Sequence, residues 1–503
     1  MGIPEHSLFQ FLAKALQTHH RFVSGTLSHA EAPIYVIGNA SADLDSIISA
    51  LVYSYFAHPR PHIPLINLPT VPSGPELRRL RPEFVKSLWL STHPPADGDQ
   101  PWDDTPSSAG KILQDHILTV ADFASHLQQH HNPDNTTTRL TADAVLVDWN
   151  ALPERSPSHH RGQGSLTGLP TIDFTVIGCI DHHADEHFLA PITTTNQPFL
   201  LQPSGSCASL VVNMLEKMAR WPRHSHPTTP TELQLSKLAM SPILIDTANF
   251  TAKEKVTDSD TLAYSFLRSK LSNASSPDIH THTITHPSPH HWDNNVFFTE
   301  IAIAKQNSLD LLTVHEVLDR DYKQWTETPS SSSSSQQTQN QKQSPLTVGI
   351  CSTVKSLPWI LRKSGNPETF LDELYTFATQ KELDIVMVMT AFSTPDHNDN
   401  SNNKKKEKFR RELLVCALGD KQEDEMGVQA VQAFISRAGS ELGLEDWTVL
   451  DREASESESE SGSGSGFAAC EHAHMWKRVW VQGDVTKSRK QVAPLIREAV
   501  WGV

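Results

Sequence analysis

FTVIGCIDHHADE, residues 174–186, is an uninterrupted apolar run that ends in an aspartate and two histidines. Continuous apolar character with β-branched residues is typical of a strand that is covered on both faces, as in a parallel sheet flanked by helices. The triplet alone is weak evidence for a site, because the chain contains 27 histidines. Its meaning depends on whether other apolar runs end in the same way.

Three other runs do so. PIYVIG (33–38) leads into NASADLDS, AVLVD (144–148) into WN, and SPILID (241–246) into TANF. We interpret all four runs as strands of one parallel sheet, with helices on both faces, and we expect a helix over 206–221. Ligands of such sheets bind beyond the carboxyl ends of the strands. The side chains expected to converge there are Asp43, Asp45, Asp148, Asp181, His182, His183 and Asp246.

Carboxylates crowded at one edge repel one another and raise each other's pKa, so the arrangement makes most sense with divalent cations bound. A shell of Asp with one or two His and no Cys favours Mg²⁺ or Mn²⁺ over structural zinc. Two cations ~3.5 to 4 Å apart would lower the pKa of a shared water and direct it at phosphorus. The pattern therefore predicts two-metal phosphoryl hydrolysis. For any single Asp, a helix N-cap or a strand-end turn is the alternative role.

Composition excludes several classes of protein. With 42 Lys+Arg against 58 Asp+Glu, the net charge of −16 argues against a nucleic-acid partner. No apolar stretch approaches the ~18 residues that a membrane helix needs, so no membrane association is expected. The N-terminal segment resembles an amphipathic helix rather than a signal peptide. The five cysteines are scattered, which suits free thiols in a reducing compartment, so we expect a cytoplasmic protein.

Low-complexity segments divide the rest of the chain. We predict disordered inserts near 330–344, 396–408 and 453–466, because these segments contain almost no apolar residues. The Pro-, Ser- and His-rich stretch at 271–295 is the predicted linker. It would separate a metal-binding catalytic domain, 1–270, from a smaller α/β domain, 296–503, that binds substrate.

The motifs GNASADLDS, LVDWN, IDHHADE and ILIDTANF, in this order, resemble those of the DHH phosphoesterase superfamily. QGDVTKSRKQVAPLI (482–496) resembles the closing motif of the DHHA2 domain, which occurs in family II pyrophosphatases, exopolyphosphatases and prune-like proteins. VGICSTVKSLPWIL (348–361) and LLTVHEVLDRDYKQW (311–325) are similar to DHHA2 segments of the exopolyphosphatase branch, of which the fungal type is the most similar.

The resemblance implies a role for each residue of these motifs. Asp148 would bridge two cations and serve in catalysis, and His183 would orient or protonate the reacting phosphate. Asp181 would orient the histidines and would not itself bind a cation. The implied metal ligands are Asn39, Asp43, Asp45, Asp148, His182 and Asp246. Asn39 departs from the pyrophosphatases, which have histidine there; an amide oxygen is the weaker ligand, and Asn is similar to the exopolyphosphatases.

The second domain would supply the positive charge. We expect Asp484 or Thr486 to cap a helix that starts near Lys487, and its first turn to bind phosphate. Cations at a helix N-terminus are electrostatically unfavourable without an anionic ligand. The predicted substrate-binding residues are His183, Ser488, Arg489 and Lys490. Weaker candidates are Lys255, Lys355 and the glycine-serine turn at 203–212.

The resemblance implies an exopolyphosphatase that acts as a monomer and releases orthophosphate from the end of inorganic polyphosphate. Family II pyrophosphatase and prune-like phosphodiesterase or partner-binding regulator remain alternatives. A nucleic-acid exonuclease of the same superfamily is disfavoured, because we find neither a GGGH-type DHHA1 motif nor an aromatic-basic groove for stacking bases.

Overall fold

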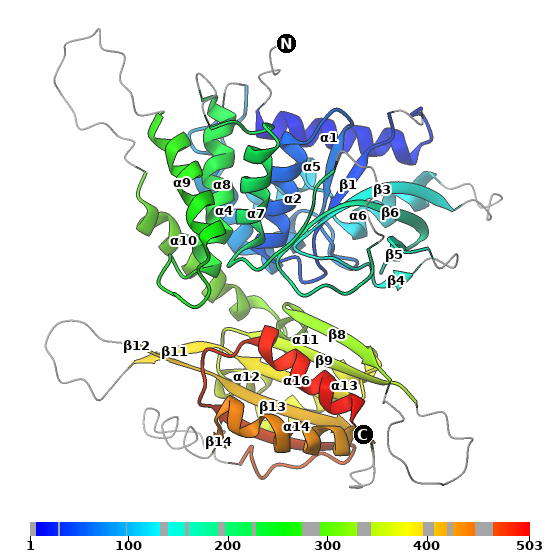
Figure 1. The fold of residues 1–503 in the computed structure, drawn as a ribbon, viewed down its shortest axis with the longest axis vertical. Coiled ribbons are helices and arrows are strands. Elements are labelled where there is room, and N and C mark those ends of the chain that lie inside the picture. Colours follow the sequence, from blue (N-terminus) through cyan, green and yellow to red (C-terminus); the bar gives the residue numbers. More distant parts are fainter. Residues whose placement is uncertain are drawn as a thin grey trace, which may run out of the picture. The chain divides into compact units, whose positions relative to one another are not determined.

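Figure 1 shows a computed structural model of the chain, which describes residues 7–28, 31–96, 98–130, 139–155, 160–189, 197–223, 228–273, 292–328, 344–395, 407–419, 426–447 and 466–502. The chain folds into two compact units, unit 1 at Met1–Leu311 and unit 2 at Leu312–Val503. The division follows α10 (Asn294–Asn307) and η2 (Ser308–Leu311), later in the chain than the predicted linker. Most of that linker, and nearly all of the three predicted inserts, lie outside the described residues.

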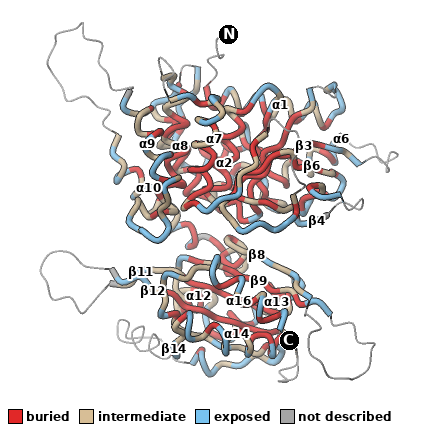
Figure 2. Tube along the Cα trace, in the orientation of Figure 1, coloured by how far each residue is buried: buried red, intermediate tan, exposed pale blue. Residues whose placement is uncertain are grey.

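Unit 1 is built on a seven-stranded sheet in the order β2-β1-β3-β6-β5-β4, with β7 paired to β6. The β2, β1, β3, β6 and β7 strands run parallel, and β5 and β4 extend the sheet antiparallel. Residues along β3 and β6 are largely buried (Figure 2), as their continuous apolar character predicts. The strands are β1 (Ile34–Ile37), β2 (His62–Leu65), β3 (Leu140–Val147), β4 (Glu154–Arg155), β5 (Gln163–Leu166), β6 (Leu169–Asp181) and β7 (Phe199–Leu201).

Helices cover both faces of this sheet, as the sequence predicts. On one face, α1 (Leu8–Val23) and α6 (Val120–His130) form a core with alternate residues of β1, including Tyr35 and Ile37. On the other, α2 (Leu44–Phe56) and α7 (Cys207–Lys217) pack together over β1 and β6 (Figure 1). Further helices of unit 1 are α3 (Pro75–Leu80), α4 (Pro82–Thr92), α5 (Pro106–His116), α8 (Pro230–Asp246) and α9 (Asp258–Asn273).

One predicted strand is wrong. Residues 241–246 form the last turns of α8, which begins at a capping box between Thr229 and Glu232 and carries Pro230 in its first turn. Eleven of the 17 residues of α8 are buried, and they are spread around the helix and leave no apolar stripe. A short apolar run of this kind cannot be told from a buried strand by periodicity, which explains the error.

Unit 2 contains a six-stranded sheet in the order β14-β15-β13-β10-β9-β8, in which only the β9–β10 pair is parallel. One face packs against α11 (Val314–Asp319), α12 (Leu357–Ser364) and α13 (Pro367–Gln380), and the other against α14 (Met426–Leu442) and α16 (Arg489–Trp501). The strands are β8 (Tyr322–Glu327), β9 (Leu346–Thr353), β10 (Ile385–Thr390), β13 (Glu412–Leu418), β14 (Leu444–Asp446) and β15 (Met475–Gln482), beside a separate hairpin of β11 (Phe392–Pro395) and β12 (Glu407–Arg410). Unit 2 is therefore the predicted second α/β domain.

The expectation of an N-terminal amphipathic helix is also met. The N-terminal segment forms α1, whose N-cap Ser7 accepts a hydrogen bond from the backbone N–H of Gln10 and whose apolar side is buried. Among the described residues, no helix combines the length and apolar character required to cross a bilayer.

Candidate metal centre

The first acidic residues of the site follow β1. Asp43 is the N-cap of α2, and its Oδ1 accepts a hydrogen bond from the backbone N–H of Ser46 at 3.0 Å. Asp45 lies in the first turn of the same helix and is buried. Gly38 permits this close turn, since a Cβ there would lie 2.7 Å from the Cβ of Ser46. Asp43 thus has the capping role that was the alternative for a single aspartate, and a carboxylate with several acceptor positions can both cap and bind a cation.

Asp148 lies at the centre of the site, directly after β3. It adopts a left-handed backbone with φ 55°, a conformation that is strained for non-glycine residues and is typically retained at functional positions. Its backbone N–H donates to the carbonyl of Ile180 at 3.0 Å, which ties it to β6. Its Oδ2 accepts hydrogen bonds from Asn39 Nδ2 at 2.8 Å and Ser46 Oγ at 2.7 Å. The orientation of the Asp148 carboxylate is therefore set before any ligand arrives.

The triplet at the end of β6 is organised by its aspartate. The buried Asp181 carboxylate accepts hydrogen bonds from the backbone N–H of His182 at 2.7 Å and from His183 Nδ1 at 2.8 Å. Asn150 Nδ2 donates to its other oxygen at 2.6 Å. Burial raises the pKa of Asp181, but the hydrogen bonds and charges of the histidines outweigh it and hold that pKa below its usual value. Asp181 therefore acts as an ionised support that orients His183.

The ring of His182 lies nearly perpendicular to that of His183. Its Nδ1 lies 2.9 Å from the carbonyl oxygen of Ser204, so that nitrogen carries the proton and donates. Its Nε2 lies 3.0 Å from Asp148 Oδ1. A histidine that donates one ring N–H to a carbonyl and aims the other nitrogen at a carboxylate has the arrangement of a metal ligand.

The N-terminus of α7 holds Asp45. The Asp45 carboxylate accepts hydrogen bonds from the backbone N–H groups of Cys207 at 2.6 Å and Ala208 at 2.8 Å, and from Ser206 Oγ at 2.8 Å. The turn at 203–212, a weaker candidate for anion binding, therefore binds an anion of the protein itself. Burial raises the pKa of Asp45 well above its usual value, and the charges of Asp148 and Asp246 raise it further.

Asp246 belongs to the same group of charges, although it ends α8 rather than a strand. Burial raises its pKa to about 6, against the opposing charge of Lys305, and Asp43 raises it further. The charge of Lys255, another weaker candidate, also lowers the pKa of Asp246. Lys355, in unit 2, lies over the ring of Trp359.

Four of the described residues form a group that could hold a divalent cation. Asp148, Asp181, His182 and His183 each offer a ligand atom, and these atoms all lie within 4.8 Å of one another. Buried carboxylates that raise one another's pKa are electrostatically unfavourable alone and would be neutralised by cations. Asn39 differs from expectation in this structure: its amide nitrogen faces Asp148 and its oxygen accepts from the Ser41 N–H at 2.9 Å.

The other predicted substrate-binding residues, Ser488, Arg489 and Lys490, lie in unit 2. The helix starts two residues later than predicted: α16 begins at Arg489, and Ser488 is its N-cap, with its N–H and hydroxyl both donating to Gln491 Oε1 at 2.9 Å. Asp484 instead accepts from the N–H and hydroxyl of Thr486, which closes a local turn and not a helix. Arg489 donates to the carbonyl of Asp321 at 2.7 Å and to its carboxylate at 2.6 Å. Lys490 is exposed.

Sequence reasoning missed the residues that hold the ligands in place. Ser46 and Asn150 lie within the quoted motifs, but polar residues at strand ends give no sign of which carboxylate they will contact. The Cys207 thiol lies 3.2 Å from both the Asp148 nitrogen and the Ile180 oxygen. Asp260, far along the chain, binds the loop before α7. Only the spacing of Thr257 and Asp260, typical of a helix start, gave any signal.

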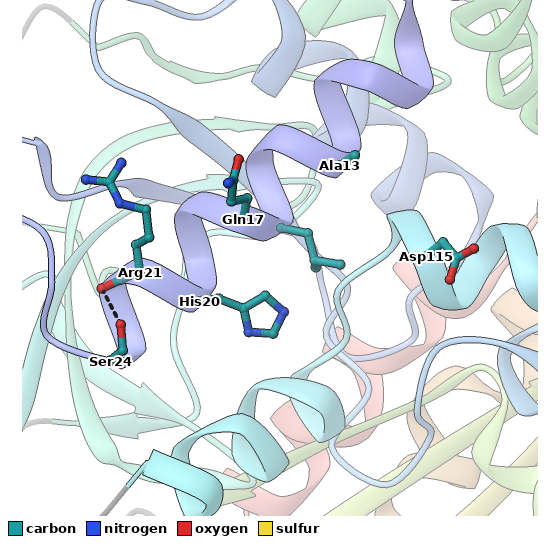
Figure 3. A pocket seen from close by; sticks show the side chains of 7 residues that line it. Ala13, Gln17, His20, Arg21, Ser24 and Asp115 are labelled. Atoms are coloured by element: carbon teal, nitrogen blue, oxygen red, sulfur yellow. Dashed lines mark hydrogen bonds between the residues drawn. The ribbon is translucent and has the colours of Figure 1, made fainter.

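A surface hollow of about 500 Å³ lies along α1 and α5, and its lining includes His20, Arg21 and Asp115 (Figure 3). None of the described residues that line it belongs to the predicted site. We assign function to the acidic cluster because a cation site requires converging charge rather than open volume.

Comparison with known proteins identifies the family of each domain. Residues 33–241 match the DHH family, N-terminal domain, and residues 299–499 match the DHHA2 domain. The chain therefore belongs to the DHH family and is a DHH-family phosphoesterase with a C-terminal DHHA2 domain.

Two particular proteins resemble it along most of its length. A Schizosaccharomyces pombe protein described as "Putative exopolyphosphatase" is 26% identical over 484 residues, which cover 95% of this chain and 93% of that protein. The crystal structure of a "putative family II inorganic pyrophosphatase" from Methanococcus jannaschii aligns with 93% of this chain and 99% of its own, at 16% identity and a TM-score of 0.42.

Proposed function

We propose that this protein is an exopolyphosphatase, which hydrolyses the terminal phosphoanhydride bond of inorganic polyphosphate and releases orthophosphate. The observation that carries the proposal is the cluster of buried Asp148 and Asp181 with half-buried His182 and His183, at the strand ends of a DHH domain. A site of this composition suits hard divalent cations and phosphate oxygens.

Two divalent cations, Mg²⁺ or Mn²⁺, would be held by Asn39, Asp43, Asp45, Asp148, His182 and Asp246. When bound, such cations neutralise phosphate oxygens and supply a water of lowered pKa as the nucleophile. For Asn39 to take part through its oxygen, its side-chain amide would turn over, which exchanges the two amide ends facing Asp148 and Ser41. The Asn39 amide is therefore the weakest of the six proposed metal ligands.

The protein's own side chains would orient the groups of the site and protonate the departing phosphate chain. Hydrogen bonds from Asn39 and Ser46 hold Asp148 Oδ2, which leaves Oδ1 directed towards His182. Asp181 binds Nδ1 of His183, so Nε2 is the nitrogen that would meet a substrate. The Asp181 carboxylate would stabilise a protonated His183, which could then give its proton to the departing phosphate chain as the P–O bond breaks.

Ser488, Arg489 and Lys490 are proposed to bind the phosphate chain. Arg489 already engages the Asp321 carboxylate, so a phosphate group would compete with that carboxylate for the guanidinium. An exchange of this kind is favourable only for an anion that can make two parallel hydrogen bonds, as phosphate does.

Polyphosphate is favoured over pyrophosphate by Asn39, at the position where the pyrophosphatases that the motifs resemble carry histidine. The name of the S. pombe relative supports the same substrate class. We also propose that the protein acts as a monomer in the cytoplasm.

The test is orthophosphate release from polyphosphate, pyrophosphate, cyclic AMP and a short oligonucleotide, each with Mg²⁺ and with Mn²⁺. A coupled phosphatase would report cleavage of the two nucleotide substrates. We expect the highest kcat/KM on polyphosphate. A higher value on pyrophosphate would identify a pyrophosphatase, and one on cyclic AMP a prune-like phosphodiesterase; either outcome would refute the proposal.

A further inference from the structure

Asp260 lies outside the metal-ligating cluster, in the first turn of α9, and is fully buried. Its Oδ2 accepts hydrogen bonds from the backbone N–H and the hydroxyl of Thr257, both at 2.8 Å, which is the usual arrangement at the start of a helix. A capping role explains those two bonds alone. The remaining bonds of the carboxylate go elsewhere.

The same carboxylate binds the loop that precedes α7. Oδ1 accepts from Ser204 Oγ at 3.0 Å and from the backbone N–H of Ser206 at 3.2 Å, while Oδ2 accepts from the N–H of Gly205 at 2.9 Å. Ser209 Oγ, within α7, donates to Oδ1 at 2.7 Å. A Cβ at Gly205 would lie 2.8 Å from Asp260 Oδ2, so only glycine permits this close approach.

This loop contacts two of the proposed metal ligands. The carbonyl oxygen of Ser204 accepts the proton of His182 Nδ1 at 2.9 Å, which directs Nε2 towards the cluster. The hydroxyl of Ser206 donates to Asp45 Oδ1 at 2.8 Å, beside the α7 amides that hold the same carboxylate. Asp260 is thus linked to a ligand histidine and a ligand carboxylate through one short segment.

The ionised form of the Asp260 carboxylate is stabilised by its hydrogen bonds. Burial raises its pKa, but hydrogen bonds from Ser209, Thr257 and Gly205 outweigh burial and leave that pKa below its ordinary value. The hydroxyl and backbone N–H groups that contact the carboxylate all donate to it, so an asparagine would place an N–H group against at least one other donor.

We propose that Asp260 is a positioning residue of the metal centre, which sets cation affinity by holding residues 204–206 against His182 and Asp45. This inference rests on the proposed function, because it requires the cluster to bind cations. Loss of a group that orients metal ligands typically weakens metal binding by about 10- to 100-fold.

The experiment measures Mn²⁺ affinity by calorimetry, and apo Tm, for the full-length protein and for Asp260→Asn. Asp122→Asn is the matched control. Asp122 accepts from the N–H and hydroxyl of Thr119 at 3.0 and 2.9 Å at the start of α6, and from the N–H of Ser73, so it repeats the capping pattern without contact to the cluster. We expect Asp260→Asn to weaken Mn²⁺ binding about tenfold or more, and Asp122→Asn to lower Tm while leaving Mn²⁺ affinity unchanged.

Equal Mn²⁺ affinity in Asp260→Asn and wild type would overturn the inference. If Asp260→Asn does not fold, Ser206→Ala removes the bond to Asp45 and keeps the loop's backbone bond to Asp260; wild-type affinity in that variant would refute the proposed link. A wild-type protein that binds no Mn²⁺ would overturn the metal centre itself. Binding of Mn²⁺ without polyphosphate hydrolysis would refute only the proposed substrate and leave the Asp260 comparison valid.

Discussion

Replacement of Asp148 by asparagine should lower kcat by about 10³-fold while preserving the fold. The left-handed backbone at φ 55° suits asparagine, one of the few side chains that adopts it readily. Its amide oxygen can still accept from Asn39 and Ser46, which now bond to Oδ2. Its N–H₂ group can donate to His182 Nε2, since the other ring nitrogen of His182 donates to Ser204. All of these polar groups thus keep a partner.

The expected changes in stability and in kcat follow from these hydrogen bonds and from the lost negative charge. With each hydrogen bond replaced, the free energy of unfolding should fall by no more than about 1 kcal/mol, or roughly 2 to 4 °C in the Tm of the metal-free protein. Catalysis loses a negatively charged ligand, which is worth several kcal/mol of transition-state stabilisation and lowers kcat by about 10³-fold.

The assay is orthophosphate release from polyphosphate at saturating Mn²⁺, beside a thermal melt of the metal-free protein. Asp143→Asn is the control, because Asp143 lies on the same strand and pairs with Arg60 near the surface. It should retain nearly full kcat. An Asp148→Asn variant that keeps more than a tenth of wild-type kcat would refute the assignment of Asp148 to the reacting centre.

The remaining predictions concern metal choice, substrate binding and pH. Asn39→His should tighten Mn²⁺ binding and shift preference towards pyrophosphate; metal titration with no change in affinity would remove this reason for favouring polyphosphate. Arg489→Ala should raise KM about tenfold or more with little change in kcat, because a charge-assisted phosphate contact contributes about 1.5 to 3 kcal/mol, and a defect confined to kcat would argue against its role. In the metal-free protein, Asp246 has a pKa raised to about 6, above its value of about 4 when unfolded, so its contribution to stability is present at low pH and lost as pH rises through 6. Thermal melts after chelation should therefore show Tm falling between about pH 4 and 6, and added Mn²⁺ should restore it; a metal-free Tm that rises over this range would contradict the proposed crowding of carboxylates.

The sheet of unit 1 and three of its strand ends could be predicted because their signal is local. Continuous apolar runs specify buried parallel strands, and the polar residues after Ile37, Val147 and Ile180 must then share one edge. The fourth run failed for a physical reason: a helix buried on all sides, such as α8, presents the same apolar run as a buried strand. Asp246 still joins the cluster, because the end of α8 brings it there.

The supporting residues could not be predicted, because their partners are distant in the chain. Asp260 and Ser206 are ordinary capping residues by sequence, and only the fold brings them to His182 and Asp45. The start of α16 was misplaced since several residues from Asp484 to Ser488 are good caps, and Gln491 selects Ser488 by completing a capping box.

The most direct test of the central claim is the number of Mn²⁺ ions bound per chain, measured by equilibrium dialysis and elemental analysis of wild type and Asp148→Asn. We predict two ions in the wild type and weakened or lost binding in the variant. A wild type without bound Mn²⁺, or a variant that binds the same number with the same affinity, would contradict the account.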